Sequence, residues 1–227
     1  MIPLVVLRPE PGGTETARRA ETMGLEVIAC PLFTVQSVAH LLPDPTKFDA
    51  VLLTSANGAR HGRDALDVTR DLPFYAVGKA TAQASGRDDA VVGPGDIAGT
   101  LPLLHEAGHR SVLHICGAEV RPYDAGSIAV ERLIVYRTIS RDDAAAELGA
   151  LADRPLCALV HSPRASARFA ALTPAQTRAR VDIVAISNAT AGECGSGWHR
   201  IHIAREPSDE AMLALAARIC QDGSARI

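Results

Sequence analysis

The sequence contains an internal repeat, and this repeat restricts the possible folds more than any other feature. Its first copy spans residues 48–86 and its second copy residues 156–195. Ser55 in the first copy matches Ser162 in the second, and the copies differ by one small insertion. A chain of 227 residues could form one large domain or two small ones. The repeat predicts two, each of about 100 residues.

Each copy has the same order of elements. A short apolar run ends on Ser55 or Ser162, and a helix-length segment then leads to a second apolar run. That second run stops at another capping turn, 78–81 or 187–190. Apolar runs of this length fit strands buried on both faces, and Ser suits the N-cap of the following helix. The order predicts parallel sheets with right-handed crossovers, in which the turns after the strands line a ligand crevice.

Two segments with alternating apolar and polar residues bracket the first copy of the repeat. They are residues 32–38 and 132–139, and period-two alternation indicates strands with one solvated face. Within the second segment we place Leu133 and Val135 on one face, and Ile134 and Tyr136 on the other.

The bracketing segments predict how the chain divides. We expect residues 1–31 and 141–227 to form a discontinuous lobe 1, and residues 40–131 to form an inserted lobe 2. Residues 32–39 and 132–140 would then be the hinge strands. The fold class is therefore α/β, with two parallel-sheet lobes and a two-stranded connection.

Composition and charge exclude several kinds of partner. The net charge of -3 gives no reason to expect binding to nucleic acid or to a membrane. The five cysteines are scattered and lack CxxC spacing, which is typical of reduced thiols in a cytoplasmic protein. The N-terminus is interpreted as a first strand rather than a signal peptide or membrane span. The sequence contains no motif typical of a metal site, a Ser-His-acid catalytic set or a phosphate-binding loop. We expect the protein to be a monomer.

Seven short motifs, taken in order, resemble the uroporphyrinogen-III synthase family over nearly the whole chain. From the N-terminus they are LRP, TSANG, VGKATA, CGAEVR, IVYRT, HSPRA and ISNATA. The resemblance implies two flavodoxin-like lobes joined by a two-stranded β ladder. It also implies that the chain closes the linear tetrapyrrole hydroxymethylbilane to uroporphyrinogen III, inverting the terminal pyrrole ring, without metal or cofactor. Such an enzyme is a cyclising lyase of tetrapyrrole biosynthesis.

The resemblance also implies site residues. The cleft tyrosine of the family falls on Tyr136, whose phenol stays protonated at neutral pH and could donate a proton to the departing hydroxyl. The candidate substrate-binding residues lie mostly in the turns after the strands, and they are Arg8, Thr54, Ser55, Asn57, Gly78, Lys79, Thr81, Gly117, Arg121, Ser162, Arg164, Asn188 and Thr190. Helix N-termini and arginines would hold the carboxylates of the substrate. The four capping turns of the repeat contain no Asp or Glu, which agrees with this.

Two features depart from the family pattern. The segment PYDAGS after Arg121 leaves little room for the helix that the family usually has there. Ser187 stands where the family has glycine, and we expect little cost because Ser can also cap a helix. The alternative function is a two-lobed binding or sensor protein for an anionic small molecule, including a degenerate synthase without turnover.

Overall fold

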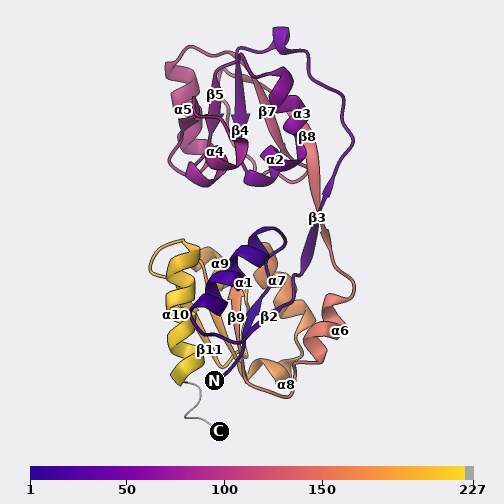
Figure 1. Ribbon diagram of the computed structural model, residues 1–227, viewed down its shortest axis with the longest axis vertical. Helices are drawn as coiled ribbons and strands as arrows, with labels where there is room; N and C mark the ends of the chain where they lie inside the picture. Colours follow the sequence, from indigo (N-terminus) through magenta and orange to yellow (C-terminus); the bar gives the residue numbers. More distant parts are fainter. Residues whose placement is uncertain (223–227) are drawn as a thin grey trace. The chain divides into compact units, whose positions relative to one another are not determined.

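The computed structural model describes residues 1–222 and divides the chain into two compact units. Unit 1 consists of Met1–Thr34 together with the chain from Ser140 onward, and unit 2 consists of Val35–Ile139. Each unit holds one sheet with helices on both faces (Figure 1). The chain therefore leaves unit 1, forms unit 2 and returns. The proposed hinge strands lie at these two crossings, and their action as a hinge stays a prediction.

Unit 1 contains a parallel sheet of five strands. The strands are β1 (Leu4–Val6), β2 (Val27–Ala29), β9 (Leu156–Val160), β10 (Val181–Ala185) and β11 (Arg200–Ile203). Their spatial order is β11-β10-β9-β1-β2, and every neighbouring pair is parallel. If the five strands are numbered 1 to 5 in chain order and the sheet is read from its β2 edge, the order is 2-1-3-4-5, which is the flavodoxin order.

Helices cover both faces of this sheet because alternate strand residues point to opposite sides. The helices are α1 (Gly12–Thr22), α6 (Ala144–Gly149), α7 (Pro163–Leu172), α8 (Ala175–Arg178), α9 (Asn188–Gly192) and α10 (Asp209–Asp222). Leu4 and Val6 pack with α1 and α10, whereas Val5 and Leu7 pack with α6, α7 and α9. None of the described helices is long and apolar enough to cross a membrane.

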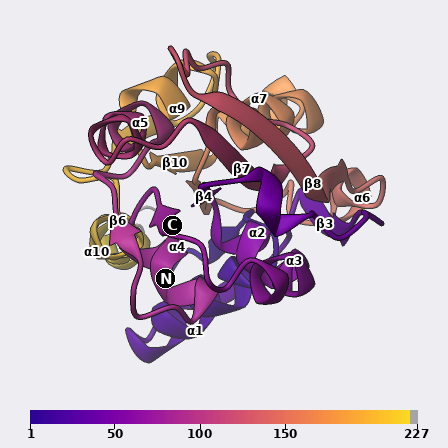
Figure 2. The same cartoon turned by 90° about the horizontal axis from the view of Figure 1, so that it is seen from above.

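The sheet of unit 2 has six strands. They are β3 (Phe33–Ser37), β4 (Ala50–Leu53), β5 (Phe74–Ala76), β6 (Val91–Val92), β7 (Ser111–Gly117) and β8 (Ala129–Ser140). The spatial order is β3-β8-β7-β4-β5-β6, with parallel pairing from β8 to β6. The long strand β8 therefore lies between β7 and β3 (Figure 2).

The five parallel strands of unit 2 repeat the arrangement of unit 1 with a different chain order. β4, β5 and β6 occupy the places of β9, β10 and β11, since both sets contain the repeat. β7 and β8 occupy the places of β1 and β2, but they come after the repeat rather than before it. If the strands β4 to β8 are numbered 1 to 5 in chain order and the sheet is read from its β6 edge, unit 2 has the order 3-2-1-4-5. The strand order reverses between β1 and β9 in unit 1, and between β4 and β7 in unit 2, and α/β sheets bind ligands at such reversals.

The helices of unit 2 are short, and one face carries most of them. They are η1 (Pro45–Lys47), α2 (Ala56–His61), α3 (Arg63–Val68), α4 (Lys79–Ser85) and α5 (Ile97–Glu106). Leu53 and Ile115 pack with α2, α3 and α4, whereas Leu52 and Val112 pack with α5.

The repeat is visible in the backbone of the capping turns. Ser55 has φ -157° and ψ 152°, and Ser162 has φ -158° and ψ 154°. At the second turn, Gly78 has φ -167° and Ser187 has φ -159°. Both values are extended backbone, which any residue adopts, so this position does not require glycine. Ser187 accepts a hydrogen bond from the amide of Thr190, and its expected capping role is confirmed.

A β-bulge corrects one prediction about Tyr136. β7 and β8 pair residue by residue as far as Cys116 with Ile134, but Gly117 then pairs with Tyr136. Val135 is therefore an extra residue in β8, and bulges of this kind redirect side chains. Tyr136 packs against the same apolar cluster as Leu133 and Val135. The prediction that Tyr136 faces away from Val135 was wrong, because strict alternation ignores the bulge.

Candidate functional site

A pocket of about 290 Å³ opens at the carboxyl ends of the parallel strands of unit 2. It lies at the reversal of strand order between β4 and β7, where ligands bind in sheets of this type. The residues that line it are Thr54 and Ser55 after β4, Val77 after β5, Gly95, Asp96 and Ile97 at the start of α5, Gly117 at the end of β7, Glu119, Val120 and Arg121 in the loop after β7, and Tyr136 on β8.

Tyr136 and Ser55 are joined at the wall of this pocket. The Tyr136 hydroxyl lies 2.9 Å from Oγ of Ser55, and that Oγ also accepts a hydrogen bond of 3.0 Å from the amide of Gly58. Ser55 can therefore donate its own proton to the Tyr136 oxygen, which leaves the phenol proton of Tyr136 to donate elsewhere. Burial raises the pKa of Tyr136 and outweighs the opposing effect of the Ser55 hydrogen bond. The phenol is thus a neutral donor at physiological pH.

Gly117 allows the ring of Tyr136 to lie against the end of β7. A Cβ atom at Gly117 would lie 2.6 Å from Cζ of Tyr136 and 3.0 Å from its hydroxyl oxygen. Nη2 of Arg132 donates to the carbonyl oxygens of Gly117 and Ala118 over 3.3 Å and 3.1 Å. The turn and the ring are therefore fixed against each other.

Replacing Gly117 by alanine should displace the Tyr136 ring. We expect a loss of about 1–3 kcal/mol in the free energy of unfolding, as for other overpacked sites, together with slower turnover. Urea unfolding and steady-state kinetics would measure both. Gly149→Ala is the matched control, because a Cβ atom at Gly149 meets nothing within 4 Å. Wild-type stability and turnover in Gly117→Ala would contradict the proposed fit.

The charge of the pocket differs from what the capping turns suggested. Its lining includes two carboxylate side chains, Asp96 and Glu119, and one guanidinium, that of Arg121. Oδ1 of Asp96 accepts a 2.7 Å hydrogen bond from the amide of Gly99 and so caps α5. The four turns of the repeat do lack acids, but loops outside the repeat contribute these two. The wall therefore suits a neutral group or developing positive charge better than a second row of carboxylates.

The pocket brings together five of the predicted residues, namely Thr54, Ser55, Gly117, Arg121 and Tyr136. The other four predicted residues of unit 2 do not line it. Oδ1 of Asn57 accepts a hydrogen bond from Arg60, and a Cβ atom at Gly78 would lie 3.6 Å from Cα of Gly95. Lys79 is exposed and Thr81 is buried. Substrate contact by these four residues stays a prediction.

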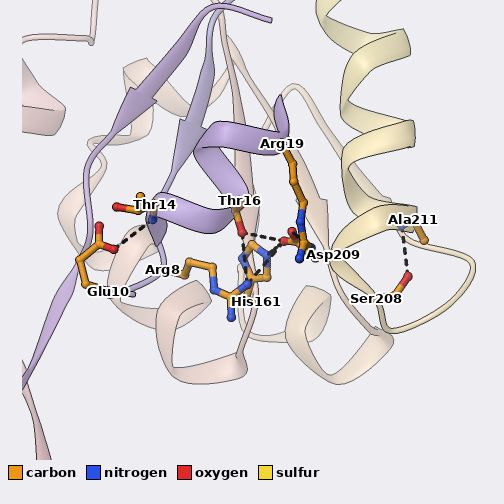
Figure 3. A network of polar contacts seen from close by, with 9 residues as sticks. All are labelled: Arg8, Glu10, Thr14, Thr16, Arg19, His161, Ser208, Asp209 and Ala211. Carbon is orange, nitrogen blue, oxygen red and sulfur yellow. Dashed lines mark hydrogen bonds and ion pairs between the residues drawn. The ribbon is translucent and has the colours of Figure 1, made fainter. Parts of the chain in front are cut away.

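Unit 1 carries a polar network at its own reversal of strand order. Figure 3 shows Arg8, Thr16, Arg19 and His161 gathered around Asp209, the first residue of α10. Nε2 of His161 lies 2.9 Å from Oδ1 of Asp209, and the Thr16 hydroxyl donates to the same oxygen over 2.8 Å. Arg19 donates to Oδ2 over 3.0 Å, and Nη1 of Arg8 lies 3.5 Å from Oδ1. The network fastens α10 to the ends of β1 and β9.

The electrostatics of this network favour a charged Asp209 and a neutral His161. Burial would raise the pKa of Asp209, but hydrogen bonds from His161 and Thr16 and the charge of Arg8 outweigh it and lower this pKa. Burial lowers the pKa of His161, and the charge of Arg8 acts in the same direction. Arg8 also packs on Gly12, where a Cβ atom would lie 2.5 Å from its Nη2. The Arg8 charge is therefore offset by Asp209, and its contact with substrate stays a prediction.

The remaining predicted residues of unit 1 lie at helix starts. Oγ of Ser162 accepts from the amide of Ala165, and the Arg164 guanidinium lies 4.6 Å from the centroid of the Phe33 ring. Asn188 is exposed at the start of α9. Thr190 is fully buried, with its hydroxyl 3.1 Å from Oγ of Ser187. These contacts stabilise the turns, and a role in binding substrate stays a prediction for all four predicted residues.

Comparison with known proteins agrees with this architecture. Residues 14–214 match the family model described as uroporphyrinogen-III synthase HemD. No curated protein matches the sequence. A crystal structure of uroporphyrinogen-III synthetase from Helicobacter pylori superposes with a TM-score of 0.67 at 21% identity, covering 96% of this chain and 100% of that one. A mutant uroporphyrinogen III synthase from the extremely thermophilic bacterium Thermus thermophilus gives a TM-score of 0.59 at 15% identity, covering 97% and 99%.

The structural likeness shows a shared fold at these levels of identity, and the family model adds the sequence evidence. The match to the family model covers both copies of the repeat and all but the ends of the chain. The chain belongs to the uroporphyrinogen-III synthase family.

Proposed function

We propose that this chain closes hydroxymethylbilane to uroporphyrinogen III with inversion of the terminal ring, and that Tyr136 in the unit 2 pocket donates the proton that the departing hydroxyl needs. Family membership supports the reaction. The single observation that supports this site is the 2.9 Å hydrogen bond between Ser55 and Tyr136 at the pocket wall.

The hydrogen bonds around Tyr136 give the proton a direction. The Gly58 amide donates to Ser55. In the arrangement that we propose, Ser55 donates to the Tyr136 oxygen 2.9 Å away, and the Tyr136 proton is left for a ligand in the pocket. When the C–O bond of the hydroxymethyl group breaks, this proton leaves with the oxygen as water. The electron pair of the pyrrole nitrogen leaves an azafulvenium cation, whose methylene carbon is attacked by the substituted carbon of the terminal ring to give a spirocycle. The older bond from that ring carbon to its neighbouring methylene group then breaks, and the released methylene carbon bonds to the free carbon of the same ring, which closes the macrocycle with the ring inverted. The proton lost when the new ring system regains aromaticity restores Tyr136, so the net products are uroporphyrinogen III and water.

The size and charge of the pocket suit one end of the substrate. Its volume of about 290 Å³ is at the lower edge of the roughly 300–1,000 Å³ usual for small-molecule sites. It can therefore take the ring that loses its hydroxyl, but not the whole tetrapyrrole. That ring develops positive charge as the hydroxyl departs, and the carboxylates of Asp96 and Glu119 stabilise such charge. The acidic arms of the substrate would extend out of the pocket, past the exposed guanidinium of Arg121.

The cysteines bear on the cellular compartment of the enzyme. We propose a cytoplasmic location, because the five cysteines are all free and buried, as expected of a chain in a reducing compartment. We also propose that the chain is a monomer, as expected from its sequence. Sedimentation of the purified chain would measure its oligomeric state.

The proposed function is tested with freshly generated hydroxymethylbilane. Free hydroxymethylbilane closes unaided to the uninverted type I isomer, so incubation with the enzyme, oxidation and separation of the products should give an excess of type III. Type I alone would exclude the enzyme. It would instead favour a two-lobed binding protein, which would retain the ligand without directing its closure.

A further inference from the structure

A chain of three polar side chains, with a buried histidine in the middle, runs inward from the wall of the unit 2 pocket. His114, in the middle of β7, is 0% exposed. Its Nε2 lies 2.9 Å from Oγ1 of Thr54, and its Nδ1 lies 3.1 Å from the hydroxyl of Tyr123. The Tyr123 ring stands edge-on to the imidazole, at 67° and 5.9 Å between centroids. Of these three residues, Thr54 lines the pocket.

Protonation states restrict how this chain can be arranged. Burial lowers the pKa of His114 to about 4, and the charge of Arg132 adds to the effect. Burial raises the pKa of Tyr123. At neutral pH the imidazole therefore carries a single proton and the phenol keeps its own, so that one ring nitrogen of His114 donates while the other accepts.

The position of the imidazole proton decides what Thr54 offers to a ligand. If Tyr123 donates to Nδ1, the Nε2–H of His114 donates to Thr54, and the Thr54 proton is then free for an acceptor in the pocket. If the proton is on Nδ1, the Thr54 hydroxyl must donate to Nε2, and it can then only accept a hydrogen bond from a ligand in the pocket. One tautomer makes Thr54 a donor, and the other makes it an acceptor.

We propose that Tyr123 holds His114 as the Nε2–H tautomer, and that His114 is thereby a positioning residue that makes the Thr54 hydroxyl a hydrogen-bond donor to the departing oxygen. The inference rests on the proposed function. Thr54 and Tyr136 reach the pocket from opposite faces of the sheet, and both line it, so an oxygen that leaves as water between them can accept from both hydroxyls. Thr54 supplies a hydrogen bond only, because the transferred proton comes from Tyr136, and no covalent bond to His114 breaks.

A second tyrosine-histidine pair in the same unit, Tyr75 and His109, has similar geometry, but its side chains are not hydrogen-bonded to a residue of the pocket. The Tyr75 hydroxyl lies 3.1 Å from Nε2 of His109, and the rings meet edge-on at 79°. Tyr75 and Tyr123 pack against the same apolar cluster. His109, however, precedes β7 at the amino edge of the sheet, and its Nδ1 lies 3.6 Å from Asp49 instead of a pocket residue. Tyr75→Phe is therefore a matched control for Tyr123→Phe.

The kinetic test is a double-mutant cycle on the full-length chain, with hydroxymethylbilane as substrate. We expect Thr54→Val to lower kcat about tenfold with little change in KM, and Thr54→Ser to restore most of the loss. Tyr123→Phe should lower kcat about threefold, because the imidazole then populates both tautomers. The same change should have no further effect in the Thr54→Val background, since Tyr123 acts through Thr54.

Two kinetic results would overturn the proposal. One is equal loss from Tyr123→Phe and Tyr75→Phe, which would indicate general destabilisation. The other is additive loss in the double variant, which would mean that Tyr123 acts without Thr54.

A second measurement does not need turnover. Nitrogen-15 NMR of the histidine rings in the wild-type chain should show a protonated Nε2 and an unprotonated Nδ1 for His114. The opposite tautomer would overturn the proposal even in an active enzyme. Failure of the proposed function would instead appear as type I product from the wild-type chain, so the two failures are distinguishable.

Discussion

Replacing Tyr136 by phenylalanine should lower turnover about 10²-fold and leave the isomer of the product unchanged. A positioned general acid contributes roughly 10²–10⁴-fold, and we expect the lower end because other hydroxyls of the pocket can still donate to the leaving oxygen. The direction of closure should survive, because it depends on how the substrate is held. Phenylalanine preserves the ring that packs against Gly117, so the variant should fold.

The measurement is kcat of Tyr136→Phe with isomer analysis of the oxidised product. Tyr75→Phe controls for the loss of a phenol hydroxyl elsewhere in unit 2, and it should keep wild-type turnover. We also expect Tyr136→Phe to slow turnover more than any other single substitution, and this is testable. If Thr81→Ala or Ser162→Ala reduced turnover equally, the hydroxyl of Tyr136 would have no special part in the reaction.

Much of this fold could be predicted because its signals are local. Short apolar runs mark the buried strands, and a serine after each run marks the helix start, as at Ser55 and Ser162. The repeat then shows that the same arrangement occurs twice. The repeat can be recognised although the strands follow one another in a different chain order in the two units, because a buried strand has the same apolar pattern whichever element precedes it.

The features that sequence reasoning missed depend on distant partners. The direction of the Tyr136 side chain depends on a bulge that forms only when β8 pairs with β7. Asp209 follows His161 by 48 residues, and His114 follows Thr54 by 60. No local spacing marks such pairs. The one available signal was His114 itself, a single histidine within the apolar strand SVLHICG, since a polar side chain in a buried strand needs a partner.

The acidic wall of the pocket was missed for a related reason. The capping turns of the repeat suggested anion binding, and they do lack acids. Asp96 and Glu119 come from loops outside the repeat, and the sheet brings them to the same edge as Ser55. A charge estimate from individual turns therefore omits these two carboxylates, because the fold combines turns that lie far apart in the sequence.

Lowering the pH should destabilise unit 2 through His114. The pKa of His114 in the folded chain is about 4, compared with 6.5 for an ordinary histidine. Between these values the unfolded chain binds a proton that the folded chain does not. Stability from this residue is therefore complete above about pH 6.5 and is lost as the pH falls toward 4. The shift corresponds to a loss of about 3 kcal/mol in the free energy of unfolding between pH 7 and pH 4.

The non-titrating variant His114→Gln isolates this contribution. Urea unfolding at pH 7 and at pH 4 should show that the difference between the two pH values shrinks by about 3 kcal/mol relative to wild type. Carboxylates and His161 titrate in both proteins, so their contributions cancel in this comparison. His105→Gln removes an exposed histidine of the same unit and serves as the control.

The ring signals of His114 in NMR provide the direct check. They should show a neutral imidazole down to about pH 5 and titrate only below that. A midpoint near 6.5 would mean that water reaches the ring. The imidazole between Tyr123 and Thr54 would then be open to solvent, and His114 could not hold a single tautomer. The stability measurement and the proposed orientation of Thr54 therefore depend on the same property, the exclusion of water from the middle of β7.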